Sequence, residues 1–112
     1  MGLKNVQTAA DSIRLTILFD RIQELADKLG VTFECEVGQK FIRIVQSTSN
    51  SGGRHVHAFV DITNGDLIKA AGWKAPAKGV NGLAVRGNLI DVTDFARILS
   101  VADRYGSYLY AR

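Results

Sequence analysis

Cysteine, proline and tryptophan each occur only once in this sequence of 112 residues. The single Cys35 cannot form a disulfide within the chain, and it alternates with Phe33 and Val37 as a buried strand residue would. No stretch of about 18 uninterrupted apolar residues occurs, and the first residues lack the pattern of a secretory signal peptide. We therefore expect a single domain, residues 1–112, in the cytoplasm.

The sequence also lacks the common catalytic and nucleotide-binding motifs. It contains no Walker-type G-x-x-x-x-G-K-[ST], no H-E-x-x-H, no C-x-x-C and no G-x-S-x-G. His55 and His57 lie close to Asp61 and could serve a metal site, a small hydrolase or a nuclease, but two imidazoles alone rarely hold a metal. We expect a protein that is not an enzyme and has no metal and no cofactor.

Acidic residues are scarce in the middle of the chain. Residues 38–90 contain seven lysine and arginine residues but only two acids, whereas residues 1–37 contain four cations and six acids. This asymmetry favours a polyanionic partner. The alternative is a solvated sheet edge whose charges prevent aggregation. The seven cations are Lys40, Arg43, Arg54, Lys69, Lys74, Lys78 and Arg86.

Apolar spacing predicts a helix at each end of the chain. From about residue 6 to residue 29 apolar side chains recur every three or four positions, and Gly30 stands where a helix-terminating glycine is expected. A second helix is predicted to begin at Asp91, to bury Phe95 and to end at Gly106. The tail after it, residues 107–110, could add an edge strand or pack on a second subunit.

Four strands are predicted between the helices. Residues 31–37 alternate apolar and polar side chains, and residues 40–46 are rich in β-branched types. Asn64-Gly65 predicts a type I′ hairpin between a third strand, residues 54–62, and a fourth that runs from Asp66 to Gly72 or Trp73. In the third strand the side chains expected on the core side are Val56, Ala58, Val60 and Ile62, with His55, His57, Phe59 and Asp61 opposite.

The remaining segments are predicted as loops. Residues 47–53 are too polar and glycine-rich to pack. Pro76 has no amide hydrogen, so it should end any ladder, and residues 74–88 are expected to be irregular. The resulting fold class is α+β: an N-terminal helix, a four-stranded antiparallel meander, a basic loop and a C-terminal helix.

Residues 69–88 read K-A-A-G-W-K-A-P-A-K-G-V-N-G-L-A-V-R-G-N, with four cations and no acid. Small residues allow close backbone approach to a ligand, and glycine-rich amides can surround phosphate oxygens. Trp73 beside Lys74 is the pairing of stacking surface and charge that single-stranded nucleic acid requires. The alternative is that Trp73 closes the hydrophobic core.

The strings W-K-A-P-A-K and R-G-N in this stretch resemble a signature of short phage-encoded proteins that are loosely linked with single-stranded DNA binding. By pattern alone, a meander with a terminal helix also resembles the module of PC4-like and Whirly-type single-strand binders, which work as oligomers. The N-terminal helix and the long basic loop depart from that pattern.

We therefore predict a non-enzymatic protein that binds single-stranded nucleic acid, with DNA as the expected form. A homodimer is predicted as well, because a meander leaves two free edges and the C-terminal tail is apolar. The alternatives are an accessory protein that binds another protein or a small anionic ligand such as a nucleotide, and a small hydrolase or nuclease. The predicted binding residues are Lys40, Arg43, Arg54, His55, His57, Phe59, Lys69, Trp73, Lys74, Lys78 and Arg86.

Overall fold

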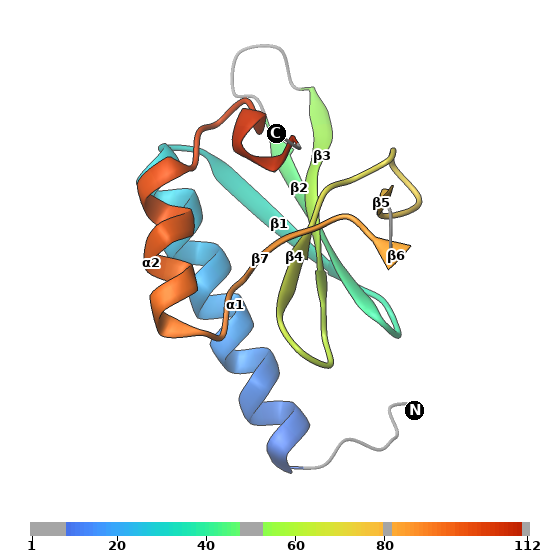
Figure 1. The fold of residues 1–112 in the computed structure, drawn as a ribbon, viewed down its shortest axis with the longest axis vertical. Helices are drawn as coiled ribbons and strands as arrows, with labels where there is room; N and C mark the ends of the chain where they lie inside the picture. The colour runs from blue at the N-terminus through green and yellow to red at the C-terminus, as the bar shows by residue number, and fades with distance from the viewer. Residues whose placement is uncertain (1–8, 48–52, 80–81, 111–112) are drawn as a thin grey trace.

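The computed structural model describes residues 9–47, 53–79 and 82–110. It confirms the α+β class, with both helices on one side of an antiparallel sheet (Figure 1). The predicted helix start near residue 6 and most of the predicted loop 47–53 lie outside the described residues. The elements are α1 (Ala9–Leu29), β1 (Thr32–Val37), β2 (Phe41–Ser47), β3 (Arg54–Asp61), β4 (Asp66–Ile68), β5 (Lys78–Gly79), β6 (Gly82–Leu83), β7 (Val85–Asn88), α2 (Val92–Val101) and the 3₁₀ helix η1 (Ser107–Leu109).

The main sheet has five strands in the order β1-β2-β3-β4-β7, and all neighbours are antiparallel. The prediction of an irregular segment over residues 74–88 is therefore wrong at its end, because Val85–Asn88 pairs with β4. The predicted fourth strand is also too long, since β4 ends at Ile68 and only an isolated bridge joins Ala70 to Pro76 beyond it. Strands β5 and β6 form a separate two-stranded hairpin.

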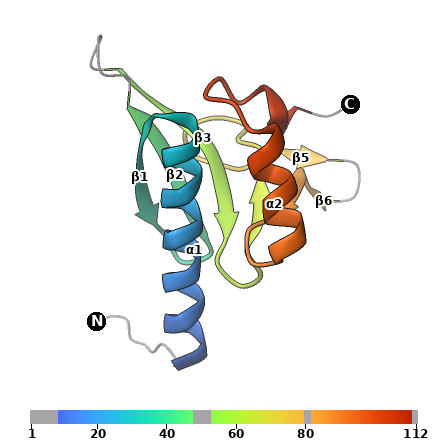
Figure 2. The ribbon, with the colours of Figure 1, turned by 90° about the vertical axis from the view of Figure 1, so that its left-hand side faces the viewer.

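Both helices cover the same face of the sheet, and Figure 2 shows them side by side in front of it. Glycine ends α1 as predicted: Gly30 has a φ of 67°, a conformation that costs glycine least. Asp91 caps α2, because its carboxylate accepts a hydrogen bond from the Asp94 amide. The core between the layers contains Leu18, Ile22, Leu25, Ile42, Ile44, Ala58, Val60, Leu67, Leu89, Phe95, Ile98 and Leu109.

The hairpin between β3 and β4 forms where Asn64-Gly65 predicts it, but with a longer turn. Four residues separate the strands, and the Gly65 amide donates to the Asp61 carbonyl at 2.7 Å. The Asp61 carboxylate accepts hydrogen bonds from the amide and the hydroxyl of Thr63, at 2.8 and 2.6 Å. Gly65 has a φ of 84°, so the glycine is needed although the turn is not the two-residue type.

The chain after α2 packs against its own domain. Helix α2 ends at Val101, not at Gly106, and Gly106 instead precedes the 3₁₀ helix. Leu109 is 2% exposed and belongs to the core of its own domain. The prediction that the tail adds an edge strand or packs on a second subunit is therefore wrong for this residue. Tyr105 and Tyr110 remain exposed, at 86% and 62%.

One extra residue in β3 changes which side chains share a face. Ile44 pairs with Ala58 and the next residue, Val45, pairs with Val56, so His57 has no partner in the register. Beyond this bulge the alternation reverses. The prediction that His57 and Phe59 lie on one face is therefore wrong, because His57 packs against Phe33 on the helix side of the sheet.

Close packing of β7 on α2 leads to a stability prediction at Gly87. A Cβ atom at this position would lie 2.6 Å from Ile98 Cδ1 and 2.9 Å from Arg97 Nη2. We expect Gly87→Ala to lower the free energy of unfolding by about 1–3 kcal/mol, because the added methyl overpacks this junction. Urea denaturation measures the change. Gly72→Ala is the matched control, since its Cβ meets nothing within 4 Å; equal stability of the two variants would contradict the packing of β7 on α2.

Candidate nucleic-acid interface

Trp73 lies on the face of the sheet opposite the helices. The segment that carries it, Lys69 to Ala84 without residues 80 and 81, is called the Trp73 segment here, and it covers part of this outer face (Figure 1). Trp73 is 41% exposed, so the alternative that it closes the hydrophobic core is wrong. The guanidinium carbons of Arg43 and Arg54 lie 5.3 and 5.6 Å from the centroid of its indole ring, within the range of cation–π attraction.

The Trp73 segment is positioned by hydrogen bonds to its backbone. Arg43 Nη1 donates to the Trp73 carbonyl at 2.8 Å, which fixes the tip of the segment over β2. The Lys69 amide donates to the Ala84 carbonyl, and the Ala77 amide donates to the Lys69 carbonyl at 2.7 Å. The Ala84 amide donates in turn to the Ala77 carbonyl at 2.8 Å. These hydrogen bonds satisfy backbone N–H and C=O groups of the Trp73 segment that would otherwise have no partner.

Two acids of β1 lie beside Arg43 and Arg54. Counting charges along the sequence did not reveal that they would pair with these arginines. Glu36 accepts hydrogen bonds from Arg43 at 2.8 Å and from Arg54 at 3.3 Å, and Glu34 accepts from Arg54 at 2.8 Å. The hydrogen bond to Glu34 raises the pKa of Arg54 above its usual value. Alternation along residues 31–37 predicts that both acids face away from the core, and antiparallel pairing of β1 with β2 then brings them to the arginines.

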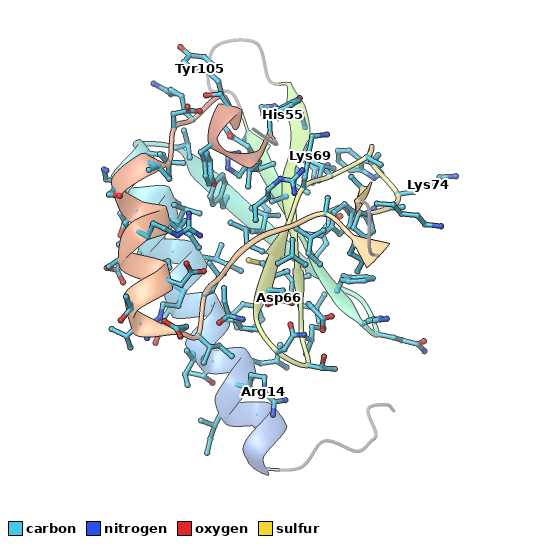
Figure 3. All side chains as sticks on the ribbon, in the orientation of Figure 1. Arg14, His55, Asp66, Lys69, Lys74 and Tyr105 are labelled. Atoms are coloured by element: carbon cyan, nitrogen blue, oxygen red, sulfur yellow. The ribbon has the colours of Figure 1, made fainter. Side chains whose placement is uncertain are left out.

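Three predicted lysines remain exposed on or beside the outer face. Lys74 projects from the tip of the Trp73 segment, at the edge of the molecule farthest from the helices (Figure 3). Lys78 lies in β5, and Lys40 precedes β2 with its ammonium 5.5 Å from the Phe41 ring centroid. Within the described parts of the chain, none of these lysines forms an ion pair. Their charges are therefore available to an anionic partner.

Phe59 is 4% exposed, so its predicted role as an exposed binding residue is wrong. It faces the outer side of the sheet, where the Phe41 ring lies edge-on to it at a centroid distance of 6.2 Å, and it pairs across strands with Arg43 and Ile68. Phe59 thus contributes packing beneath the candidate interface, and a ligand on the surface cannot reach it.

His57 is 6% exposed and packs against Phe33 on the helix side of the sheet, so it does not belong to the outer face, which corrects its predicted role there. Its Nδ1 lies 3.1 Å from Gln46 Oε1 and its Nε2 lies 2.7 Å from the Tyr108 hydroxyl. A neutral ring satisfies both groups when Nδ1 donates to Gln46 and Nε2 accepts from Tyr108. Burial lowers the pKa of His57 to about 4, and the same burial raises the pKa of Tyr108.

Arg86 also has a structural partner. Its Nε donates to the Leu109 carbonyl at 2.6 Å and so ties β7 to the 3₁₀ helix. Arg86 is also a predicted binding residue, and this contact gives it a structural role as an anchor of the C-terminal segment. His55 and Lys69 line a separate small pocket near that segment.

The residues proposed for a metal site or a hydrolase do not come together. His57 points to Tyr108 while Asp61 bonds Thr63 at the opposite end of β3, and His55 is exposed beyond the bulge. Across residues 9–47, 53–79 and 82–110, no group of three His, Cys, Asp or Glu side chains could hold a metal ion. Burial raises the pKa of the Cys35 thiol, which disfavours the reactive thiolate.

Comparison with known proteins gives one match. The profile of a family of unknown function, DUF7717, matches residues 4–111. No curated protein and no solved structure matches the chain. In the described part of the chain, neither helix is long and apolar enough to cross a membrane.

The buried His57 predicts a loss of stability in acid. Its folded-state pKa of about 4 lies below the ordinary value of 6.5, so the unfolded chain binds a proton at a higher pH than the folded domain does. We therefore expect full stabilisation above pH 6.5 and a loss on the order of 2 kcal/mol as the pH falls to about 4.5.

Urea denaturation at several pH values measures this loss, and proton NMR of His57 Cε1–H gives its pKa directly. His57→Gln should remove this part of the pH dependence, whereas His55→Gln, at an exposed site, should keep most of it, because burial is the larger cause of the lowered pKa and the charge of His55 the smaller. An NMR pKa near 6.5 would show that the ring is not buried in solution.

Proposed function

The chain belongs to DUF7717, a family of unknown function, and we propose that it binds single-stranded DNA through the outer face around Trp73. The observation that carries the proposal is the exposed indole held beside two guanidinium groups. Stacking of a base on an aromatic side chain contributes about 1–3 kcal/mol, and it tolerates any base because each has a π face. A duplex keeps its bases stacked inside, so an exposed indole favours an unpaired strand.

The charges around Trp73 complement a phosphate backbone. Lys40, Lys74 and Lys78 make no ion pair within the described chain and can contact phosphates. Arg43 and Arg54 are already bonded to Glu36, so we assign them mainly to holding the indole and its segment in place. The surplus positive charge thus comes from the lysines, and the arginines provide rigidity.

Self-association forms the second part of the proposal. Strands β1 and β7 end the sheet, and β1 offers six residues to a neighbouring strand. The first half of α1 exposes Ile13 and Phe19. A two-fold dimer built on these features would carry two Trp73 faces, and two linked sites raise the affinity for one strand through effective concentration.

The first prediction of this proposal concerns Trp73. We expect Trp73→Ala to weaken binding of a single-stranded oligonucleotide by roughly 5- to 150-fold, which is the loss of about 1–3 kcal/mol of stacking. The melting temperature should change little, because the ring is 41% exposed. Fluorescence polarisation of a labelled oligo-dT measures the affinity. The affinity of the wild type should fall steeply between about 50 and 200 mM salt.

Lysine variants test the charge component of the same surface. Lys74→Ala and Lys78→Ala should each weaken binding at unchanged stability, since both side chains are exposed. Arg104→Gln is the control: it removes an exposed cation that follows α2, away from the outer face. A preference for duplex, or an affinity that does not depend on salt, would refute the proposed function.

The second prediction is the oligomeric state. Multi-angle light scattering at micromolar concentration should give about twice the 12.2 kDa mass of the chain. Replacement of the exposed apolar residues by Ile13→Glu and Phe19→Glu should shift the protein toward the monomer, because a charge at an apolar interface has no partner. A wild-type mass near 12.2 kDa at every concentration would refute the dimer.

A further inference from the structure

A small pocket lies between β3, the start of the Trp73 segment and the C-terminal segment. Its volume is about 170 Å³. Figure 3 shows His55 and Lys69 next to each other there, with Tyr105 above them. Its lining includes His55, Lys69, Ala70, Tyr105, Gly106 and Tyr110.

Lys69 brings a positive charge without an acidic partner to this pocket. Its side chain is half-buried, and its Nζ makes one long hydrogen bond, 3.5 Å, to the Ala70 carbonyl. No acidic side chain in the described chain lies within ion-pair distance of it. The ring of Tyr110 lies 4.6 Å from Nζ and offers only the weaker attraction of its π face. A partly desolvated ammonium with unused hydrogen-bond donors is a site for an anionic group.

The other walls of the pocket suit a nucleotide. The side chain of His55 is exposed and makes no hydrogen bond with the described residues, so its imidazole can donate to a phosphate oxygen. Tyr105 and Tyr110 are 86% and 62% exposed at the rim and present aromatic surface to a base or sugar. The volume exceeds the roughly 30 Å³ of a water molecule several-fold and is below the roughly 300 Å³ of a site for a drug-sized ligand. It therefore fits a phosphate with part of its sugar.

The pocket lies beside the start of β3, where Arg54 on the outer face is followed by His55 on the helix side of the sheet. Arg54 contacts Trp73, and His55 is the next residue of the same strand. Lys69 begins the segment whose tip carries Trp73. A strand whose base stacks on Trp73 would pass around the start of β3 to place a neighbouring nucleotide at Lys69.

We propose that this pocket binds the phosphate of one nucleotide, with Lys69 as the charged contact, His55 as a hydrogen-bond donor and the two tyrosines against the sugar and base. The assignment to a DNA strand rests on the proposed function. Binding of the phosphate itself depends only on the pocket. The same chemistry would accept a free nucleoside monophosphate, a 5′-terminal phosphate or an internal phosphate of a strand.

Titration with dTMP, followed by two-dimensional amide NMR, tests the pocket directly. We expect the amide signals of His55, Ala70 and Gly106 to shift, with weak, millimolar affinity. Lys69→Gln should reduce this affinity at least five-fold, and Tyr110→Ala should reduce it as well. Arg104→Gln is the matched control, because it removes an exposed cation next to Tyr105 that does not line the pocket. Inorganic phosphate should compete with dTMP. Shifts that are absent, or that Lys69→Gln leaves unchanged, would refute the proposal.

Polarisation assays with oligo-dT that carries a 5′-phosphate or a 5′-hydroxyl distinguish a terminal phosphate from an internal phosphate as the ligand of the pocket. Tighter binding of the phosphorylated strand, lost in Lys69→Gln, identifies a terminal phosphate as the ligand. Equal binding of both strands, weakened in Lys69→Gln, identifies an internal phosphate. If oligo-dT binds through Trp73 while dTMP and Lys69→Gln have no effect, the pocket proposal fails and the proposed function stands. If dTMP binds but oligo-dT binds no more tightly, the pocket stands and the proposed function fails.

Discussion

The extra residue at His57 is the constraint on which both faces of the sheet depend. Because Val45 pairs with Val56 and Ile44 with Ala58, the alternation of β3 reverses at this point. One result is that Arg54 shares a face with Arg43, and the two guanidinium groups meet at Trp73. The other is that His57 turns inward, where Gln46 and Tyr108 satisfy its ring nitrogens. A regular strand would place Arg54 on the side of the hydrophobic core. The bulge therefore places Arg54 beside Trp73 on the outer surface, and it also places His57 where the C-terminal segment can bond to it.

Local signals in the sequence predict the parts of the fold that are decided locally. The apolar spacing of α1, the glycine that ends it and the cap at Asp91 follow from the chemistry of a few adjacent residues, and the structure contains all three. The pairing of β7 with β4 depends on contacts between segments that are distant in the sequence. Pro76 and the small residues around it favour the prediction of a loop there. No glycine in residues 54–62 indicates the bulge, so a regular alternation along these residues assigns the wrong face to His57. Burial of Phe59 likewise depends on neighbours from other strands, which include the Phe41 ring and Ile68.

Charge counted along the chain differs from charge arranged in space. The excess of cations in residues 38–90 predicts a basic surface, but β1 brings Glu34 and Glu36 from the acidic first third of the chain to its arginines. The pairs leave the lysines as the positive groups of the surface and make the arginines part of its framework. Lys69 differs from the two arginines, because its half-buried ammonium lies over an aromatic ring and not beside an acid. Trp73, in contrast, could be picked out from the sequence as the residue to test, and its exposure is the property that only the fold reveals.

The Trp73 segment is held mainly through its main chain. The bonds from Lys69 to Ala84, from Ala77 to Lys69 and from Ala84 to Ala77 use backbone groups that every residue type except proline provides. The path of the segment is thus largely independent of the side chains at its tip. Selection can exchange those side chains, and with them the chemistry of the surface, while the scaffold beneath stays intact. In this respect the segment resembles the variable loops that rigid sheets present in recognition domains, where one framework accommodates many specificities.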